Sequence, residues 1–217
     1  MADAGPADPG PAYTRLAGLS IGRLAALSDG IFAVVMTLLV LDLHAPARAA
    51  IRSPGDLGAA LGRLWPSVVG YLMSFLTLGI FWLAQQVQLD ADRRGDRNLT
   101  WLHLGFLLGI SLMPFSTALL ARFMSYRLAL GLYWANLLLV GVMLLACWRY
   151  ARRAGLLTPE GEAGAFPVNQ RRIVRAQVLY ALAALACVVS TYLSVAVLVA
   201  LQVDSAVSPR WGLLRRL

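Results

Sequence analysis

The chain has 217 residues, of which 59% are apolar and 14% are charged, and its mean hydropathy is +0.68. A soluble domain of this length needs a larger charged surface, so the composition excludes a soluble fold and predicts a membrane-embedded protein. The net charge is +8, and every basic residue is an arginine. Because these arginines lie between apolar segments, we interpret them as charges that set membrane topology, and we expect no nucleic-acid partner.

The first 22 residues are rich in Ala, Gly and Pro and contain no continuous apolar core. This composition predicts a disordered N-terminal tail at 1–22 and argues against a cleaved signal peptide. A single transmembrane domain is predicted at 23–205, since no internal repeat is evident, and a basic C-terminal tail at 206–217.

Four apolar segments are each long enough to cross a bilayer of about 30 Å. They run over Leu24–Leu43, Trp65–Gln86, Asn98–Phe123 and Leu128–Tyr150. Pro66 suits the first turn of the second helix, and Pro114 is expected to kink the third. The Pro- and Gly-containing segment Ala154–Val168 is predicted to be a loop on the inner side.

The last apolar stretch, Ile173–Val203, is too long for one span, because a helix of this length would reach about 46 Å. It fits two short helices with a turn near Ser190, Thr191 and Tyr192. Six spans with an inner N-terminus place 14 of the 19 arginines inside, whereas five spans would place 11 there. We therefore predict an all-α membrane protein with six transmembrane helices, cytoplasmic N- and C-termini, and a short hairpin formed by the last two helices.

Polar residues open the first apolar segment. Ser28 and Asp29 precede the run Ile31–Leu41, and Arg23 lies six positions before Asp29. Ionisable groups at membrane depth are costly and are therefore candidates for function. Ser28 could simply cap the helix. Asp29 follows a turn of apolar residues, so it needs partners on neighbouring helices or in a water-filled vestibule.

Farther along this helix, Val34, Leu38 and Leu41 form one stripe at positions i, i+4 and i+7, with Thr37 beside it. Such a stripe is typical of ordinary helix packing. It would also form a hydrophobic constriction if several copies faced one another around a pore. Periodicity alone leaves both interpretations open.

A family resemblance favours the pore. The pattern Arg23-x-x-x-Leu27-Ser28-Asp29-Gly30 resembles the Arg-x-x-x-Phe-Ser-Asp signature of the endosomal/lysosomal potassium channel family, the transmembrane protein 175 family, in its six-helix prokaryotic branch. The continuation Ile31–Asp42 is similar to that branch as well. Weaker matches follow in the same order at Phe81-Trp82, Asn98-Leu99, Pro114–Thr117 and Tyr133-x-x-Asn136.

The resemblance implies a homotetramer in which the first helix of each subunit lines the conduction path. Val34 would form the narrowest ring, Leu38 and Leu41 further apolar rings, and Thr37 a hydroxyl layer that favours potassium. A polar network holding the first helix to the second and third would comprise Arg23, Ser28, Asp29, Trp82, Gln85 and Asn98. Gln85 and Gln86 stand where relatives usually carry histidines, and glutamine does not titrate. Leu27 replaces the Phe of the signature, and Val34 is smaller than the usual Ile or Leu.

The sequence therefore predicts a cation channel with modest potassium selectivity in the plasma membrane of a prokaryote, with itself and the lipid bilayer as partners. It contains no Thr-Val-Gly-Tyr-Gly segment, so a filter made of backbone carbonyls is excluded. The alternatives are a proton- or cation-coupled transporter that uses Asp29, and a non-conducting structural subunit. An enzyme is not expected, because His44 and His103 are isolated and no metal-ligand spacing occurs. We expect no cofactor beyond the permeant potassium ion.

Overall fold

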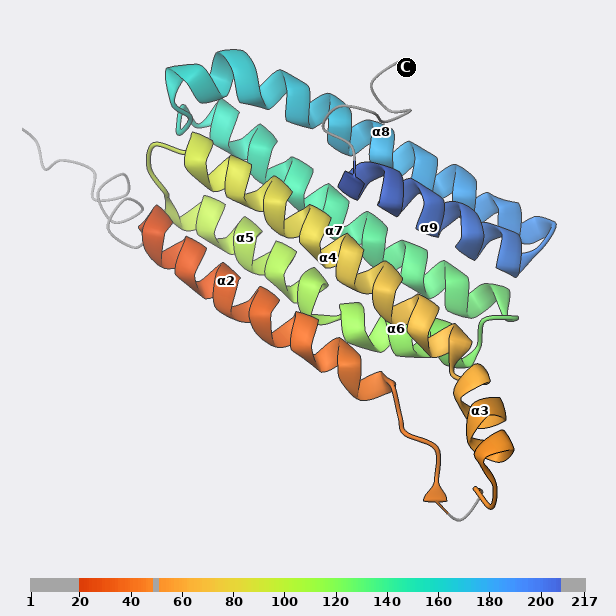
Figure 1. Ribbon diagram of the computed structural model, residues 1–217. Coiled ribbons are helices and arrows are strands. Elements are labelled where there is room, and N and C mark those ends of the chain that lie inside the picture. The colour runs from red at the N-terminus through yellow and green to blue at the C-terminus, as the bar shows by residue number, and fades with distance from the viewer. Residues whose placement is uncertain (1–19, 49–50, 208–217) are drawn as a thin grey trace, which may run out of the picture.

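The computed structural model describes residues 20–48 and 51–207, and these residues are mainly helical (Figure 1). The predicted disordered and basic tails lie almost wholly outside the described residues. Four helical segments are long and apolar enough to cross a membrane, and they match the four predicted spans. They are Ile21–Asp42, Trp65–Ala91, Arg97–Arg122 and Arg127–Arg153. The chain is thus an all-α, multi-pass membrane protein.

The first span consists of helix α2 (Ile21–Leu38) and a 3-10 turn, η1 (Leu39–Asp42). Helix α2 begins at Ile21 because the Ser20 side chain caps it, accepting a hydrogen bond from the Arg23 backbone N–H at 3.3 Å. The expectation that Ser28 could act as a cap is wrong, because Ser28 lies two turns inside the helix.

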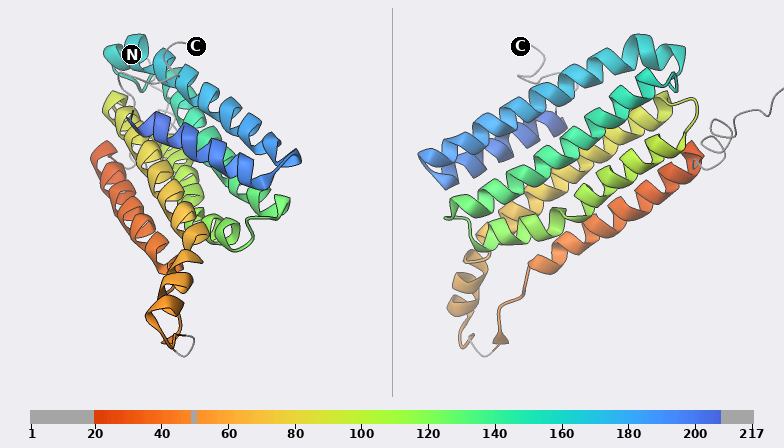
Figure 2. Two further views of the ribbon diagram at one scale, coloured as in Figure 1. Left: turned by 45° about the vertical axis from the view of Figure 1, so that its right-hand side comes forward. Right: turned by 180° about the vertical axis from the view of Figure 1, so that it is seen from behind.

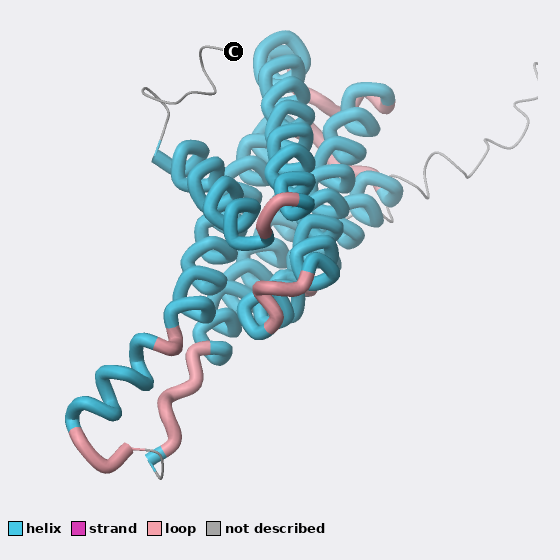
Figure 3. The backbone as a smooth tube through the Cα atoms, turned by 90° about the vertical axis from the view of Figure 1, so that its right-hand side faces the viewer, coloured by secondary structure: helices cyan, strands magenta, loops and turns pink. Residues whose placement is uncertain are grey.

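A short helix that was not predicted from the sequence, α3 (Pro54–Gly62), lies between the first two spans. Ser53 and Asp56 form a capping box at its start. No residue of α3 is buried, and the helix projects beyond the end of the bundle next to the α2–α3 connection (Figure 3). The helix therefore contributes nothing to the core of the single chain.

The second span is one helix, α4 (Trp65–Ala91). The third is divided into α5 (Arg97–Ser111) and α6 (Met113–Arg122). The break lies immediately before Pro114, which has no N–H to donate, and this agrees with the predicted kink. The fourth span is α7 (Arg127–Arg153).

The C-terminal part is more helical than predicted. The segment predicted as a loop, Ala154–Val168, is partly helical, because a π turn, η3 (Gly161–Ala165), leads directly into α8 (Phe166–Leu185). After a 3-10 turn, η4 (Ala186–Val188), helix α9 (Thr191–Val207) begins where the sequence placed the turn. Helix α8 carries three arginines and α9 has 17 residues, so neither counts as a span by length and composition, and the total of six remains a prediction.

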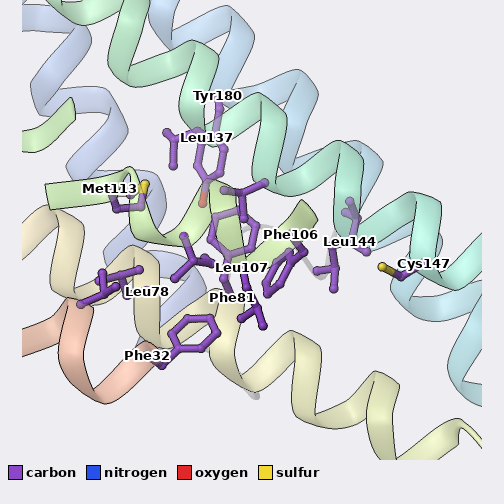
Figure 4. Close-up of a cluster of buried hydrophobic side chains, with 14 of the residues drawn as sticks. Phe32, Leu78, Phe81, Phe106, Leu107, Met113, Leu137, Leu144, Cys147 and Tyr180 are labelled. Atoms are coloured by element: carbon purple, nitrogen blue, oxygen red, sulfur yellow. The ribbon is translucent and has the colours of Figure 1, made fainter. Parts of the chain in front are cut away.

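Helices α2 and α8 form opposite edges of the bundle, with α4, α5 and α7 between them (Figures 1 and 2). An aromatic cluster fills the centre, where the ring centroid of Phe106 lies 6.2 Å from that of Phe32 and 6.3 Å from that of Phe81 (Figure 4). Trp148 and Tyr133 are also fully buried in the core. The core of the bundle is thus formed within a single chain, and α2 packs only one of its own faces against this core.

Candidate functional site

The buried face of α2 is set by residues spaced three or four apart. These residues are Leu24, Ser28, Phe32, Val35 and, in η1, Leu39. They pack against α4 and α5, because apolar side chains at this spacing lie along one side of a helix. Ser28 is the one polar member of this face, so it needs a partner inside the bundle.

Polar anchors join α2 to the C-terminal half of α4. The Ser28 hydroxyl, which is fully buried, donates a hydrogen bond to Gln85 Oε1. One residue further along α2, Asp29 Oδ1 accepts two hydrogen bonds, from Trp82 Nε1 and from Gln86 Nε2, each at 2.8 Å. Trp82, Gln85 and Gln86 lie within little more than one turn of α4. The carboxylate therefore links α2 to a neighbouring helix and is not isolated in an apolar environment.

The opposite face of α2 and η1 is unburied in the single chain, and it is mainly apolar beyond Gly30. Val34 is 57% exposed, Leu38 43% and Leu41 65%. Arg23, Gly30 and Thr37 lie on this same face, since they are separated from Val34 by eleven, four and three residues. The predicted stripe is therefore not a packing surface of the chain's own core, which was one of the two interpretations of its periodicity.

Thr37 has its hydroxyl hydrogen engaged locally. Its Oγ1 donates to the Val34 carbonyl oxygen at 2.7 Å, a bond to the preceding turn that threonine commonly makes in helices. Because the hydrogen is used in this way, the oxygen keeps its lone pairs for other partners.

Two residues of the predicted polar network are not brought to it. The Arg23 side chain is exposed on the outward face of α2 and makes no hydrogen bond or ion pair to Ser28, Asp29 or α4 within the described residues. Asn98 is exposed in the first turn of α5, where it neighbours the Tyr150 hydroxyl. The network therefore joins α2 to α4 alone, and the expected link to the third span is not formed by these side chains.

Gln86 belongs to the site although the predicted network named only its neighbour Gln85. The two adjacent glutamines point to different residues of α2, because successive helical positions differ by about 100°. Gln85 is fully buried and reaches Ser28, whereas Gln86 is half-buried and reaches Asp29. Gln86 could have been predicted from the sequence, because the adjacent polar pair Ser28 and Asp29 on α2 is matched by an adjacent polar pair on α4.

The histidines and cysteines give no sign of a second centre. His103 is fully buried, and its Nδ1 lies 3.0 Å from the Leu99 carbonyl oxygen, a packing contact within its own helix. Within the described residues, no group of three or more His, Cys, Asp or Glu side chains could hold a metal ion.

The Ser28–Gln85 contact can be tested by a double-mutant cycle. Ser28→Ala should lower the free energy of unfolding by about 1–3 kcal/mol, because it leaves the buried Gln85 carbonyl oxygen without a donor. In the Gln85→Leu background the same change should have little effect, since no orphaned acceptor remains. Thermal unfolding of the four proteins in detergent measures the coupling, and additive effects of the two changes would contradict the contact.

The sequence matches the family described as endosomal/lysosomal potassium channel TMEM175 over residues 23–114. It is 33% identical to a potassium channel of Streptomyces collinus over 166 residues, covering 74% of this chain and 79% of that protein. It is 30% identical to a potassium channel of Chamaesiphon minutus over 139 residues, covering 63% of this chain and 68% of the relative.

Two further likenesses extend the comparison. The crystal structure of a lysosomal potassium-selective channel TMEM175 homologue from Chamaesiphon minutus superposes on this chain with a TM-score of 0.76 at 26% identity, covering 86% of this chain and 96% of that one. The human endosomal/lysosomal proton channel TMEM175 is 36% identical over 112 residues, but only 22% of its length is covered. The similarity to the bacterial proteins therefore spans the bundle, and the similarity to the human protein spans about half of this chain.

Proposed function

Because this chain belongs to the endosomal/lysosomal potassium channel TMEM175 family, we propose that it is a channel through which potassium passes down its gradient. The single observation that carries the proposal is the unburied apolar stripe Val34–Leu38–Leu41 on the helix that opens with the family signature. The bacterial relatives named as potassium channels support it. A channel catalyses no chemical step, so no enzymatic role is assigned.

The channel is a homotetramer in which α2 of each subunit faces a common axis. Its position at one edge of the bundle supports this arrangement (Figures 1 and 2). The hydrogen bonds of α2 also support it. Ser28 and Asp29 bind α4 within the same chain and leave Val34 and Leu41 free to contact other copies. The permeant ion is the only ligand required, and no cofactor is assigned.

Conduction is controlled by whether water fills the apolar constriction. A ring of Val34 side chains, followed by rings of Leu38 and Leu41, excludes water when it is narrow and so blocks ions without a charged gate. The Thr37 oxygen, with its hydrogen bonded to the Val34 carbonyl, presents lone pairs to ions that have shed part of their hydration shell. Potassium sheds water more readily than sodium, so this combination gives a modest preference for potassium.

The chain crosses the plasma membrane of a prokaryote six times, with both termini in the cytoplasm. Helices α8 and α9 supply the fifth and sixth spans. The distribution of arginines supports this topology, and so do α8 and α9 packing on one another as a hairpin. In this orientation Leu41 lies toward the outer mouth of the pore, and the α4–α5 turn lies in the cytoplasm.

Reconstituted protein in liposomes with an outward potassium gradient tests the function. Dye-monitored flux should follow the potassium gradient without saturating and should be faster for potassium than for sodium. Saturable uptake that requires a proton gradient would instead identify a transporter using Asp29. No flux from verified, folded protein would leave only a structural subunit.

A further inference from the structure

The cytoplasmic end of α4 is fastened to the connector between α7 and α8. Two backbone hydrogen bonds, each 2.8 Å long, run from the Arg93 N–H to the Leu156 carbonyl and from the Thr158 N–H to the Ala91 carbonyl. They flank an isolated antiparallel bridge between Asp92 and Leu157. Gly155, at φ +62°, allows the connector to turn back after α7. We call this pair of short segments, 91–93 and 156–158, the strap.

The strap buries a carboxyl group that has no partner. The Asp92 side chain is 7% exposed, and neither of its oxygens makes a hydrogen bond within the described residues. Gln88, one turn earlier on the same side of α4, is fully buried with both amide atoms also unpaired. Buried polar groups are nearly always paired, so this end of the bundle is an exception that calls for a physical reason.

Among the residues that the structure describes, no cationic side chain pairs with this carboxyl. The buried Cys147 thiol on α7 is among the groups that interact with it. The charged residues at this end of the surrounding elements are instead exposed to solvent. They are Asp90 on α4, Arg93 and Arg94 after it, Arg97 on α5, Arg149, Arg152 and Arg153 on α7, Glu160 before η3 and Glu162 on η3. Asp96, at the start of α5, is bound to the Leu99 N–H and the Tyr150 hydroxyl.

Burial therefore raises the pKa of Asp92 to about 7. When the strap opens, the carboxyl meets water and its pKa returns to the ordinary value of about 3.9. The closed form thus binds the proton more tightly, so the strap is most stable at low pH and loses stability as the pH rises toward 7. Above that value the carboxyl is ionised in both forms and the dependence levels off.

The turns of α4 just before the strap are the ones that hold α2. Trp82, Gln85 and Gln86 lie within the last three turns of α4, on the same continuous helix as Asp92. Opening of the strap removes the two backbone hydrogen bonds that hold the end of α4, and a helix end that loses such contacts frays more readily. Loss of order in these turns would loosen the three hydrogen bonds that fix the position of α2.

We propose that Asp92 is a proton-binding site on the cytoplasmic side, and that proton binding there closes the strap and so clamps the α4 anchors of α2. The strap is a local two-state element, and the proton is the ligand that favours its closed state. Its placement on the cytoplasmic side rests on the proposed topology, but the proton-binding site does not depend on whether the chain conducts.

Hydrogen exchange of the whole purified protein in nanodiscs tests the proposal without relying on flux. The Arg93 and Thr158 amides report the opening of the strap once intrinsic exchange rates are corrected for pH. In the wild type, the opening constant should be about tenfold smaller at pH 6 than at pH 8, as the two pKa values require. Amides of α2 next to Asp29 should follow the same trend more weakly.

Two variants sharpen the test. Asp92→Asn, which keeps the shape of the neutral carboxyl, should hold the strap closed and remove its pH dependence. Asp90→Asn, an exposed carboxylate two residues away, should behave as the wild type does. A wild-type opening constant that is unchanged from pH 8 to pH 6 would overturn the site even if Asp92→Asn does not fold. A pH-dependent strap with pH-independent α2 amides would overturn the clamp.

Discussion

Val34→Asn is expected to raise passive potassium flux through the reconstituted protein by about tenfold or more. An amide at the narrowest apolar ring keeps water in the constriction, which lowers the barrier created by dewetting. A tenfold increase requires the free-energy barrier to conduction to fall by about 1.4 kcal/mol, which four substituted side chains are sufficient to provide. Flux per folded protein in liposomes, measured at equal protein loading, gives the result.

The matched control for this change is Val142→Asn on α7. Val142 is also about half exposed, at 47%, but it lies on a helix that has no place at the proposed axis. It receives the same chemical change and should leave flux at the wild-type level. Equal flux from all three proteins would show that Val34 does not border the conduction path.

Asp29→Asn is expected to reduce the amount of folded tetramer more than it changes ion preference, and Asp29→Ala should have the larger effect. Hydrogen bonds to a charged acceptor are worth about 1.5–3 kcal/mol each, and Asp29 accepts two. Asparagine keeps an acceptor oxygen for Trp82 and Gln86 but loses the charge, whereas alanine loses the acceptor entirely. Size-exclusion chromatography and thermal unfolding measure the loss.

Ion preference is measured on the surviving Asp29→Asn tetramer. The potassium-to-sodium flux ratio should stay near the wild-type value, because Asp29 is bonded to α4 behind the pore stripe. The exposed carboxylate Asp90 provides the comparison, and Asp90→Asn should change neither yield nor ratio. A fully assembled Asp29→Asn protein that has lost its selectivity, or its transport altogether, would place the carboxylate in the ion path.

Long apolar segments predicted most of the helices. The four spans were found because about 20 apolar residues in a row have few alternatives to a membrane helix. Pro114 marked the division of the third span because proline cannot donate within a helix. Helix α3 was missed because it has nine residues, three of them glycine, and no buried face from which periodicity could be recognised.

Whether a site residue could be predicted depended on how far along the chain the residues that define its surroundings lie. Ser28 and Asp29 stood out because polar residues are rare in such a segment, and their partners on α4 followed from the resemblance. The motif assigned Arg23 and Asn98 to the same network. Helical geometry, however, turns the Arg23 side chain outward, and Asn98 is exposed in the first turn of α5. Asp92 could not be predicted at all, since its burial results from a connector that pairs with it 65 residues later in the chain.

Substituted-cysteine block at Val34 tests most directly whether the outward face of α2 lines the pore. Val34→Cys protein is reconstituted and its potassium flux is recorded before and after addition of Cd²⁺, with Val142→Cys and the wild type as controls. Thiols from several copies around one axis would bind the ion together, so we expect nearly complete block of Val34→Cys and no block of the controls. Undiminished flux through Val34→Cys, with its thiol modified only by a membrane-soluble reagent, would mean that the stripe faces lipid.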